Sequence, residues 1–327
     1  MINQNKNHTS IIFAGHFAVD HIIRFKRINK PSLGGSVSFC SLALRKYTRN
    51  AKISIISHIG TINFNNSLLN KIRNKNINLS GIKYSQIKNT NFVLDYFDHA
   101  RILTLKSRSP NLNSNDIPSE YLKDPPDIFV FVPLCNEISL DYVSQILKKF
   151  PDAYIGVDLQ GFIRKIDDKG NVVYVYDNEI IANMKRIIEL IGDRLILKGS
   201  EEEMKLLAGE CNEFEEVMIH CGKYDNNGIF IMTLGEKGSM LTKKGKKILK
   251  IPAFKAKKVI DETGAGDVYF SIFLYEFIRS DKSWKAIENA AYLASAAASF
   301  LVEKKGSAGF KTKKRVLKRV ISAKYIN

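Results

Sequence analysis

The feature that most constrains this chain is a regular alternation of short apolar runs with amphipathic segments of helix length. Residues Ile128–Val132 are apolar at every position, which is typical of a parallel strand buried on both faces. Strand-type and helix-type segments then follow one another to about residue 234. Repeated strand–helix–strand units predict an α/β fold, with a mostly parallel sheet covered by helices on both sides.

Similar segments extend the pattern toward both ends of the chain. Further strands are predicted at Ile11–Ala14, Lys52–Ile59, Tyr154–Asp158, Arg194–Lys198 and Gly228–Leu234. Helices are predicted at Ser36–Tyr47, Leu68–Asn76, Leu140–Lys149, Glu179–Ile191, Glu201–Ala208, Gly266–Ile278 and Trp284–Val302. With no internal repeat and no low-complexity linker, we expect a single domain spanning residues 1–327.

Two segments fall outside this layered pattern. Phe92–Tyr96 and Ile102–Lys106 are β-type and flank a polar turn at Asp98–Ala100, which predicts a hairpin. Their alternation of polar and apolar residues predicts one solvated and one buried face. We therefore expect a small β lid on the main domain, built from about residues 15–34 and 92–107.

The formal net charge of +17 raises the question of a nucleic-acid partner. Lysine and arginine are spread along the chain, however, and form dense runs only at 243–258 and 311–319. Runs of this kind are usually solvated surface. We therefore expect no nucleic acid as the main partner, although a basic surface helps to attract a nucleotide and an anionic substrate.

Cysteine spacing and hydropathy bear on the compartment. The four cysteines contain no C-x-x-C pair, which favours reduced thiols over a metal site or a disulfide framework. The apolar run Ile11–Ala14 is too short for a signal peptide, and Ala290–Val302 is shorter than a membrane-spanning helix. We expect a cytoplasmic protein with no membrane partner.

The strongest chemical signal is Asp-Glu-Thr-Gly-Ala-Gly-Asp at residues 261–267, directly before an apolar helical run. The small residues Gly264, Ala265 and Gly266 would let backbone amides approach a phosphate, and the start of a helix adds unpaired N–H groups and a positive dipole end. Asp267 falls in the first helical turn. It is either a helix-capping carboxylate or a base directed at a substrate hydroxyl, and the heptad alone leaves both open.

This heptad resembles the signature of the PfkB, or ribokinase-like, family of carbohydrate kinases, D-x-T-G-A-G-D. Gly34-Gly35 is similar to the family's N-terminal glycine pair, and Asp20 to its early substrate-binding aspartate. Residues 233–238 resemble the family's T-x-G-x-x-G turn near the nucleotide. The resemblance covers about residues 11–310, nearly the whole chain.

The resemblance implies a ribokinase-like three-layer α/β/α fold and a kinase that transfers a phosphoryl group from ATP, with Mg²⁺, to a substrate hydroxyl. It implies that Asp267 is the general base and that Gly264, Ala265 and Gly266 form the anion hole. The implied substrate-binding residues are Asp20, Gly34, Gly35 and Asp158. The implied nucleotide-binding residues are Thr233, Gly235, Gly238 and Thr263.

Two of these residues have a second reading. Asp158, which follows a predicted strand, resembles a family segment at the carboxyl edge of the sheet, but it also suits an ordinary turn. Many family members carry N-x-x-E to organise the water shell of Mg²⁺, and here Ser200 replaces the Asn while Glu203 keeps its place. Glu203 is therefore the expected metal residue, acting through water, although glutamates at a helix start also complement the helix dipole.

The acceptor stays open among a sugar, a polyol and a nucleoside, and we favour a sugar or sugar-like polyol over a nucleoside. A catalytically silent, metabolite-binding regulator is the alternative from another class, but the intact Asp267 and glycine loop argue against it. The sequence has no G-x-x-x-x-G-K-[ST], H-E-x-x-H or G-x-S-x-G pattern. A homodimer formed through the lid is a further expectation that rests on the resemblance.

Overall fold

The computed structural model describes residues 8–24, 27–28, 31–97, 100–209, 211 and 213–326. Within these residues the central sheet has nine strands in the order β16-β15-β14-β13-β10-β9-β1-β5-β6. Their bounds are β1 Thr9–Ala14, β5 Ala51–Gly60, β6 Asn78–Ser85, β9 Ile128–Phe131, β10 Tyr154–Asp158, β13 Leu195–Ser200, β14 Ile229–Thr233, β15 Ser239–Thr242 and β16 Leu249–Ile251. The strands from β14 to β6 are parallel, and β15 and β16 are antiparallel to their neighbours.

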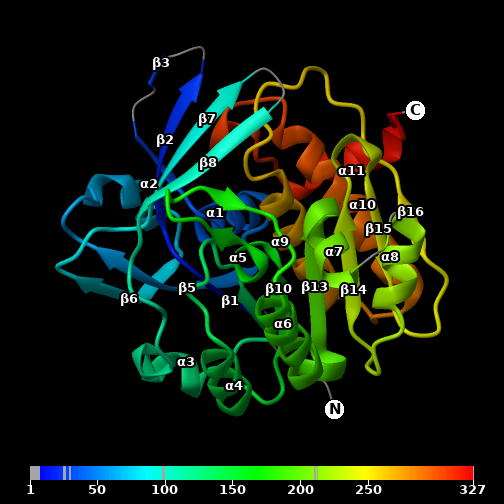
Figure 1. Ribbon diagram of the computed structural model, residues 1–327. Coiled ribbons are helices and arrows are strands. Elements are labelled where there is room, and N and C mark those ends of the chain that lie inside the picture. The colour runs from blue at the N-terminus through cyan, green and yellow to red at the C-terminus, as the bar shows by residue number, and fades with distance from the viewer. Residues whose placement is uncertain are drawn as a thin grey trace.

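Both faces of this sheet are covered by helices, which makes three layers (Figure 1). One face packs against α1 Ser36–Tyr47, α9 Ala265–Ile278, α10 Trp284–Leu301 and α11 Lys313–Ser322. The other packs against α4 Leu140–Lys149, α6 Asn178–Ile191, α7 Glu201–Ala208 and α8 Phe214–Cys221. In β1, Ile11 and Phe13 point to the first layer and Ile12 and Ala14 to the second, which explains why the strand is apolar throughout.

A second, smaller sheet rises above the central one in Figure 1, at the end where β2, β7 and β8 are labelled. It runs β3-β2-β7-β8, with β4 also paired to β2. The bounds are β2 Ala18–Arg24, β3 Arg27–Ile28, β4 Ser32–Gly34, β7 Asn91–Phe97 and β8 Ala100–Ser107. Phe92 and Leu94 of β7 are buried on its inner face, whereas Ile102 of β8 is about half exposed.

The predicted elements are largely confirmed, including the helix at Ser36–Tyr47 and the antiparallel pairing of the two lid segments. Residues 98 and 99 of the predicted turn lie outside the described residues. The helix predicted at Leu68–Asn76 is wrong in extent: it is a 3₁₀ turn, η1 Asn66–Leu69, followed by the four-residue α2 Asn70–Arg73. It ends before Asn76, whose φ of 54° is incompatible with a right-handed helix.

Several elements were not anticipated. Strands β6, β15 and β16 and helices α8 and α11 are absent from the predicted set, because they are short or carry many polar residues. α11 occupies the basic run 311–319, and its charged residues leave only Val316 fully buried. Every helix in the described part of the chain is too short or too polar to cross a bilayer.

Candidate active site

The loop before α9 is shaped by Gly264. Its φ of 83° and ψ of 7° lie in the left-handed region, and a Cβ atom there would overlap the Phe39 ring. The Ala265 amide donates to the Glu262 carbonyl at 3.1 Å, but the amides of Gly264 and Gly266 have no hydrogen-bond partner among the described residues. Two of the three amides of the expected anion hole are therefore free to bind an anion, and the Ala265 amide is already engaged.

Asp267 lies two residues into α9, partly exposed to a cavity of about 260 Å³. Burial and the nearby charge of Asp158 raise the pKa of Asp267 to about 6, against the smaller opposing effects of Lys198, a hydrogen bond with the Ser36 side chain, and Arg164. A carboxylate with this pKa is ionised at neutral pH and accepts a proton more readily than an ordinary aspartate. The alternative of a plain helix-capping carboxylate does not explain its cavity-facing, desolvated setting.

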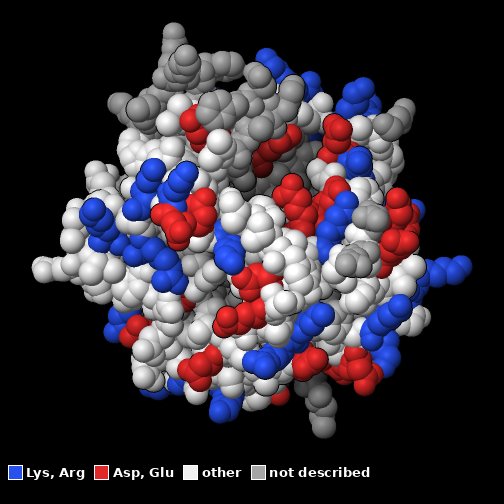
Figure 2. Space-filling model, in the orientation of Figure 1, with Lys and Arg blue, Asp and Glu red and all other residues white. Residues whose placement is uncertain are grey.

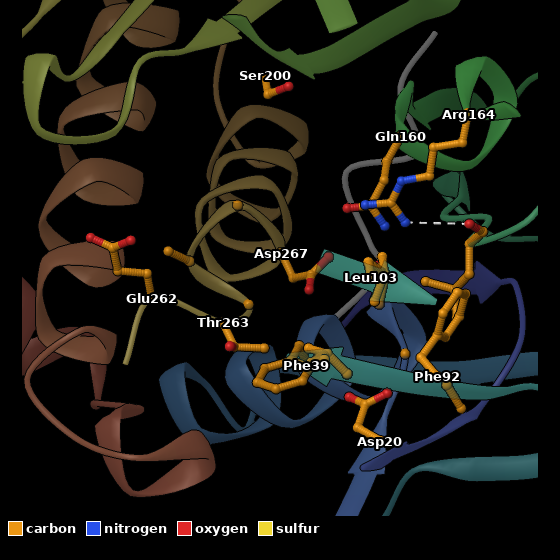
Figure 3. Close-up of a pocket in the computed structure, with 18 of the residues that line it drawn as sticks. Asp20, Phe39, Phe92, Leu103, Gln160, Arg164, Ser200, Glu262, Thr263 and Asp267 are labelled. Atoms are coloured by element: carbon orange, nitrogen blue, oxygen red, sulfur yellow. Dashed lines mark hydrogen bonds between the residues drawn. The ribbon is translucent and has the colours of Figure 1, made fainter. Parts of the chain in front are cut away.

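The cavity lies at the carboxyl edge of the central sheet, where open α/β sheets bind ligands. Ser200 ends β13, Thr233 ends β14, and Gln160 follows β10, and all three line the cavity. Figure 3 shows Asp267 between Gln160 and Arg164 on one side and Asp20 with Phe39 on the other. Segments far apart in the sequence thus supply one concave surface.

Asp20 enters this cavity from β2 of the small sheet, as expected for a substrate-binding residue. Gly34 does not line the cavity: a Cβ at Gly34 would overlap the Asp20 carboxylate, so this glycine makes room for Asp20. Gly35 does line the cavity. It directly precedes α1, and its φ of 88° lies in the left-handed region that favours glycine. The pair is therefore required by the close approach of β4 and α1 to Asp20 and to the cavity.

Asp158 is placed differently from the direct substrate contact that the sequence suggested. It is buried and does not line the cavity, and its Oδ2 accepts a hydrogen bond from Lys198 Nζ at 2.8 Å. Lys198 lines the cavity, and its Nζ would be 3.1 Å from a Cβ built on Gly266. This geometry favours Asp158 as the residue that positions Lys198 beside the anion loop.

Lys198 and Arg164 were missed at the sequence level. Lys198 is 5% exposed, and the field of Asp158, Glu203 and Asp267 outweighs burial and raises its pKa, so it stays charged. Arg164 is also 5% exposed; its Nε donates to the Tyr174 hydroxyl at 3.0 Å and a terminal nitrogen to the Leu134 carbonyl at 3.3 Å (Figure 3). The sequence does contain a signal for Lys198: it directly follows the apolar run Leu195–Leu197, and a lysine in a buried strand is rare unless it is paired with a carboxylate.

Thr263, which was expected to bind the nucleotide, links the loop before α9 to the small sheet. The Tyr96 hydroxyl on β7 lies 2.9 Å from the Thr263 hydroxyl, and Thr263 lines the cavity that contains Asp267. The small sheet is thus in contact with the anion loop. Its inner residues Phe92, Leu94 and Leu103 form the apolar wall of the cavity.

A neighbouring cavity of about 240 Å³ shares Thr233, Glu262, Ala265 and Gly266 with the first. Gly235 and Gly238 line it, as expected for nucleotide-binding residues. Gly238 has a φ of 89°, and a Cβ there would overlap the Ile251 carbonyl, so only glycine fits. The rest of the lining is mainly apolar, contributed by Phe254, Val259, Tyr269, Val302 and Ile326.

Glu203 lines the first cavity at the start of α7 and is 3% exposed. Its Oε2 accepts from the Ser200 amide at 2.8 Å and its Oε1 from the Tyr174 hydroxyl at 3.2 Å, while its own amide donates to Ser200 Oγ at 3.3 Å. Ser200 and Glu203 therefore form a capping box. The carboxylate is held rigidly toward the cavity and keeps lone pairs for a metal-bound water, so it fits the water-mediated Mg²⁺ role.

Within the described residues, the group of side chains close enough to hold a metal ion directly is His16, Cys135 and Glu137. These residues are already engaged: the His16 ring contacts the Thr90 hydroxyl at 2.9 Å and the Pro110 carbonyl at 2.8 Å. Glu137 accepts from the amides of His16, Leu134 and Cys135. The cluster links the segments that precede β2 and β7 to the segment that follows β9.

A desolvated carboxylate, unpaired amides at a helix start and an apolar pocket beside those amides are the parts that a phosphoryl transfer to a small molecule needs. This arrangement defines a small-molecule kinase. Residues 39–314 match the family described as pfkB family carbohydrate kinase, and the chain belongs to that family.

Relatives and solved structures agree with this assignment. The chain is 26% identical over 309 residues to a nucleoside kinase of Methanocaldococcus jannaschii, covering 90% of this chain and 91% of the relative. Its fold is similar to a fructokinase from Vibrio cholerae O395 bound to fructose, ADP and calcium ion, with 18% identity, a TM-score of 0.75 and coverage of 96% and 99%. It is also similar to a pyrophosphate-dependent kinase of the ribokinase family complexed with a pyrophosphate analogue and myo-inositol, with 18% identity, a TM-score of 0.72 and coverage of 94% and 99%. The ribokinase-like three-layer fold is confirmed.

Proposed function

We propose that this protein transfers the γ-phosphoryl group of ATP to a hydroxyl of a sugar or sugar-like polyol, with Asp267 as the general base. The observation that carries the proposal is the position of Asp267, whose pKa is raised to about 6, in a cavity next to the free amides of Gly264 and Gly266. A hydroxyl held there has a proton acceptor on one side and an anion-binding helix start on the other.

In this mechanism the acceptor binds between Asp20 and Arg164, with its reacting hydroxyl toward Asp267. Asp267 takes the hydroxyl proton as the oxygen forms its bond to the γ-phosphorus and the bond to the β,γ-bridging oxygen breaks. The amides of Gly264 and Gly266 and the ammonium group of Lys198 stabilise the charge on the transferred group. Asp158 keeps that ammonium group in place.

The mainly apolar pocket beside Gly238 supports a nucleotide as the donor. Pyrophosphate would need only the amides and cations, whereas a purine gains from burial against Phe254, Val259 and Tyr269. Thr233 and Gly266 line both cavities, so the phosphates of a nucleotide bound here would reach the acceptor.

Mg²⁺ would be carried mainly by the nucleotide phosphates, whose charge it neutralises, with Glu203 holding a water of its shell.

The small sheet acts in this proposal as a lid that excludes water from the cavity, since Tyr96 already contacts Thr263. Its partly exposed outer face, which includes Ile102, is the surface through which a homodimer would form. The cytoplasmic location stays a prediction.

A nucleoside is the second candidate acceptor, favoured by one observation. Phe92, Leu94 and Leu103 form an apolar wall opposite the polar groups. This wall suits the base of a nucleoside better than the hydroxyl-rich surface of a polyol. The polar groups Asp20, Gln160 and Arg164 suit either acceptor, because both carry hydroxyls.

The test is a panel of sugars, polyols and nucleosides incubated with the protein, Mg²⁺ and either ATP or pyrophosphate, with the phosphorylated product measured directly. We expect product from ATP with at least one sugar or polyol, and none from the Asp267→Asn variant at matched concentration. Product from pyrophosphate alone would overturn the proposed donor, and product from nucleosides alone would replace the acceptor. An Asp267→Asn enzyme with full turnover would refute the assigned base.

A further inference from the structure

A separate cavity of about 720 Å³ lies at the far end of α1 from the proposed active site. Three segments enclose it: the last turn of α1 with Thr48 and Arg49, α2 with the turn after it, and the chain from Ser307 to Thr312. Its lining includes the five cations Arg45, Lys46, Arg49, Lys71 and Lys75. No acidic side chain belongs to its lining among the described residues.

These cations are not neutralised by the protein. Several lysines elsewhere are paired with a carboxylate, as Lys52 is with Asp124 at 2.6 Å. None of the five lining cations has a carboxylate partner in the part of the chain that the structure describes. Five like charges around one concavity repel each other, and a bound anion would remove that repulsion.

Arg45 is fixed in place rather than mobile on the surface. Its guanidinium donates to the carbonyls of Arg49 at 3.3 Å, Ala51 at 2.7 Å and Asn76 at 3.0 Å. These bonds join the end of α1 to the turn after α2 and hold a positive charge at the cavity without an anion. A preorganised cation binds an anion with a smaller entropic cost than a flexible one.

The edge of the cavity is also crowded with positive charge. Burial lowers the pKa of Lys311, and the charge of Arg315 lowers it further; Glu303 opposes this shift, and Lys304 and Lys46 add smaller lowering effects. The positive field thus extends beyond the lining residues. Figure 2 shows that basic and acidic side chains both occur across the face that it presents.

We propose that this cavity is a second anion site that binds the polyphosphate group of a small molecule. A chain of three or more phosphates carries enough charge to neutralise several lysines at once, and its size suits a concave space enclosed on three sides. Leu42, Tyr47 and Phe310 form an apolar floor that could also take a base. The site does not share lining residues with the acceptor or nucleotide cavities, and it does not depend on the proposed kinase function.

The test is calorimetric titration with inorganic tripolyphosphate without added nucleotide or Mg²⁺. The donor site is unchanged in every protein compared, so the affinity lost in a variant of this cavity reports on this cavity alone. A triple variant, Lys46→Gln with Lys71→Gln and Lys75→Gln, removes three exposed cations and leaves the structural Arg45 in place. The matched control removes three exposed lysines elsewhere, at Lys223, Lys246 and Lys247.

We expect the first variant to bind at least tenfold more weakly than the wild type and the control to bind within twofold of it. Affinity of the wild type should fall as salt is raised. Guanosine triphosphate titrated in the same way distinguishes the ligand source: tighter binding than tripolyphosphate indicates a nucleotide, and equal binding indicates that phosphates alone are recognised.

Equal affinity for tripolyphosphate in the wild type and the first variant would overturn the proposal. An equal loss of affinity in the first variant and the control would also overturn it, because it would indicate attraction by the overall charge and an adventitious ion only. A short single-stranded oligonucleotide that used the same lysines and bound at least tenfold more tightly than tripolyphosphate would replace the small ligand by nucleic acid. The titration needs no turnover, so a failed kinase assay would not affect its outcome.

Discussion

The Asp267→Asn substitution should stabilise the protein while it abolishes catalysis. The pKa of Asp267 is about 6 in the folded protein and 3.8 in an unfolded chain. Between these two pH values the folded state binds more protons than the unfolded state, so stability falls as pH rises through this window and the penalty is complete above about pH 6. A difference of 2.2 units, at 1.36 kcal/mol each, is at most about 3 kcal/mol at pH 7.

Asparagine has the same shape and no charge to desolvate, so the variant avoids this penalty. We expect its free energy of unfolding at pH 7 to exceed that of the wild type by about 1–3 kcal/mol, and the excess to shrink as the pH is lowered toward 4. Chemical denaturation at several pH values measures both quantities. Asp168→Asn, which alters an exposed carboxylate, should change stability by less than about 0.5 kcal/mol.

The reasoning would be refuted by an Asp267→Asn protein that is less stable than the wild type at pH 7, or by an excess that does not depend on pH. Either result would mean that the Asp267 carboxylate is favourably placed in the folded state, so its pKa would not be raised. A stabilised but inactive variant would instead show that the site keeps a destabilising charge for its chemistry.

Four further predictions follow from the same site. The kcat/KM should fall about tenfold per pH unit below about pH 6, because Asp267 must be ionised to accept a proton; a pH–rate profile that stays flat to pH 4.5 would contradict this. Lys198→Met should lower the free energy of unfolding, measured by chemical denaturation, by about 3–5 kcal/mol, because it leaves Asp158 buried and unpaired. The control Lys205→Met, on the surface of α7, should lower it by less than about 1 kcal/mol. Gly264→Ala should reduce kcat at least about a hundredfold with the circular dichroism spectrum retained, since a Cβ there overlaps Phe39 and displaces the anion loop; normal turnover would exclude the loop from phosphate binding. Tyr96→Phe should raise the acceptor KM several-fold, corresponding to about 1 kcal/mol for the lost contact with Thr263, and an unchanged KM would mean that this contact does not hold the lid closed.

Much of the fold was predictable because it depends on local patterns. Strands buried on both faces must be apolar throughout, and amphipathic helices must repeat with a period near 3.6, so β9, β13, α4 and α6 could be placed closely. The weak points were segments whose structure depends on neighbours. β6 carries exposed polar residues and pairs only with β5 at the sheet edge, so its pattern gave little signal.

The site could be predicted in part. The heptad 261–267, with its small residues before the second aspartate, predicted an anion loop and the position of Asp267. The cavity does contain Asp267, Asp20 and Gly35. Their roles stay predictions until activity is measured. The sequence did not indicate that the Ala265 amide is engaged by Glu262, or that Thr263 contacts Tyr96, because both depend on distances between loops.

The sequence by itself determined the layered α/β architecture, the family and the position of the glycine loop, since hydrophobic period and local backbone freedom are properties of short segments. Only the tertiary structure decided how the charges are arranged. Asp158 is 40 residues from Lys198 along the chain, and the two meet because β10 and β13 are parallel neighbours whose ends coincide. Burial then gives this pair and Asp267 their properties, because the cost of a charge depends on the groups and the solvent that surround it.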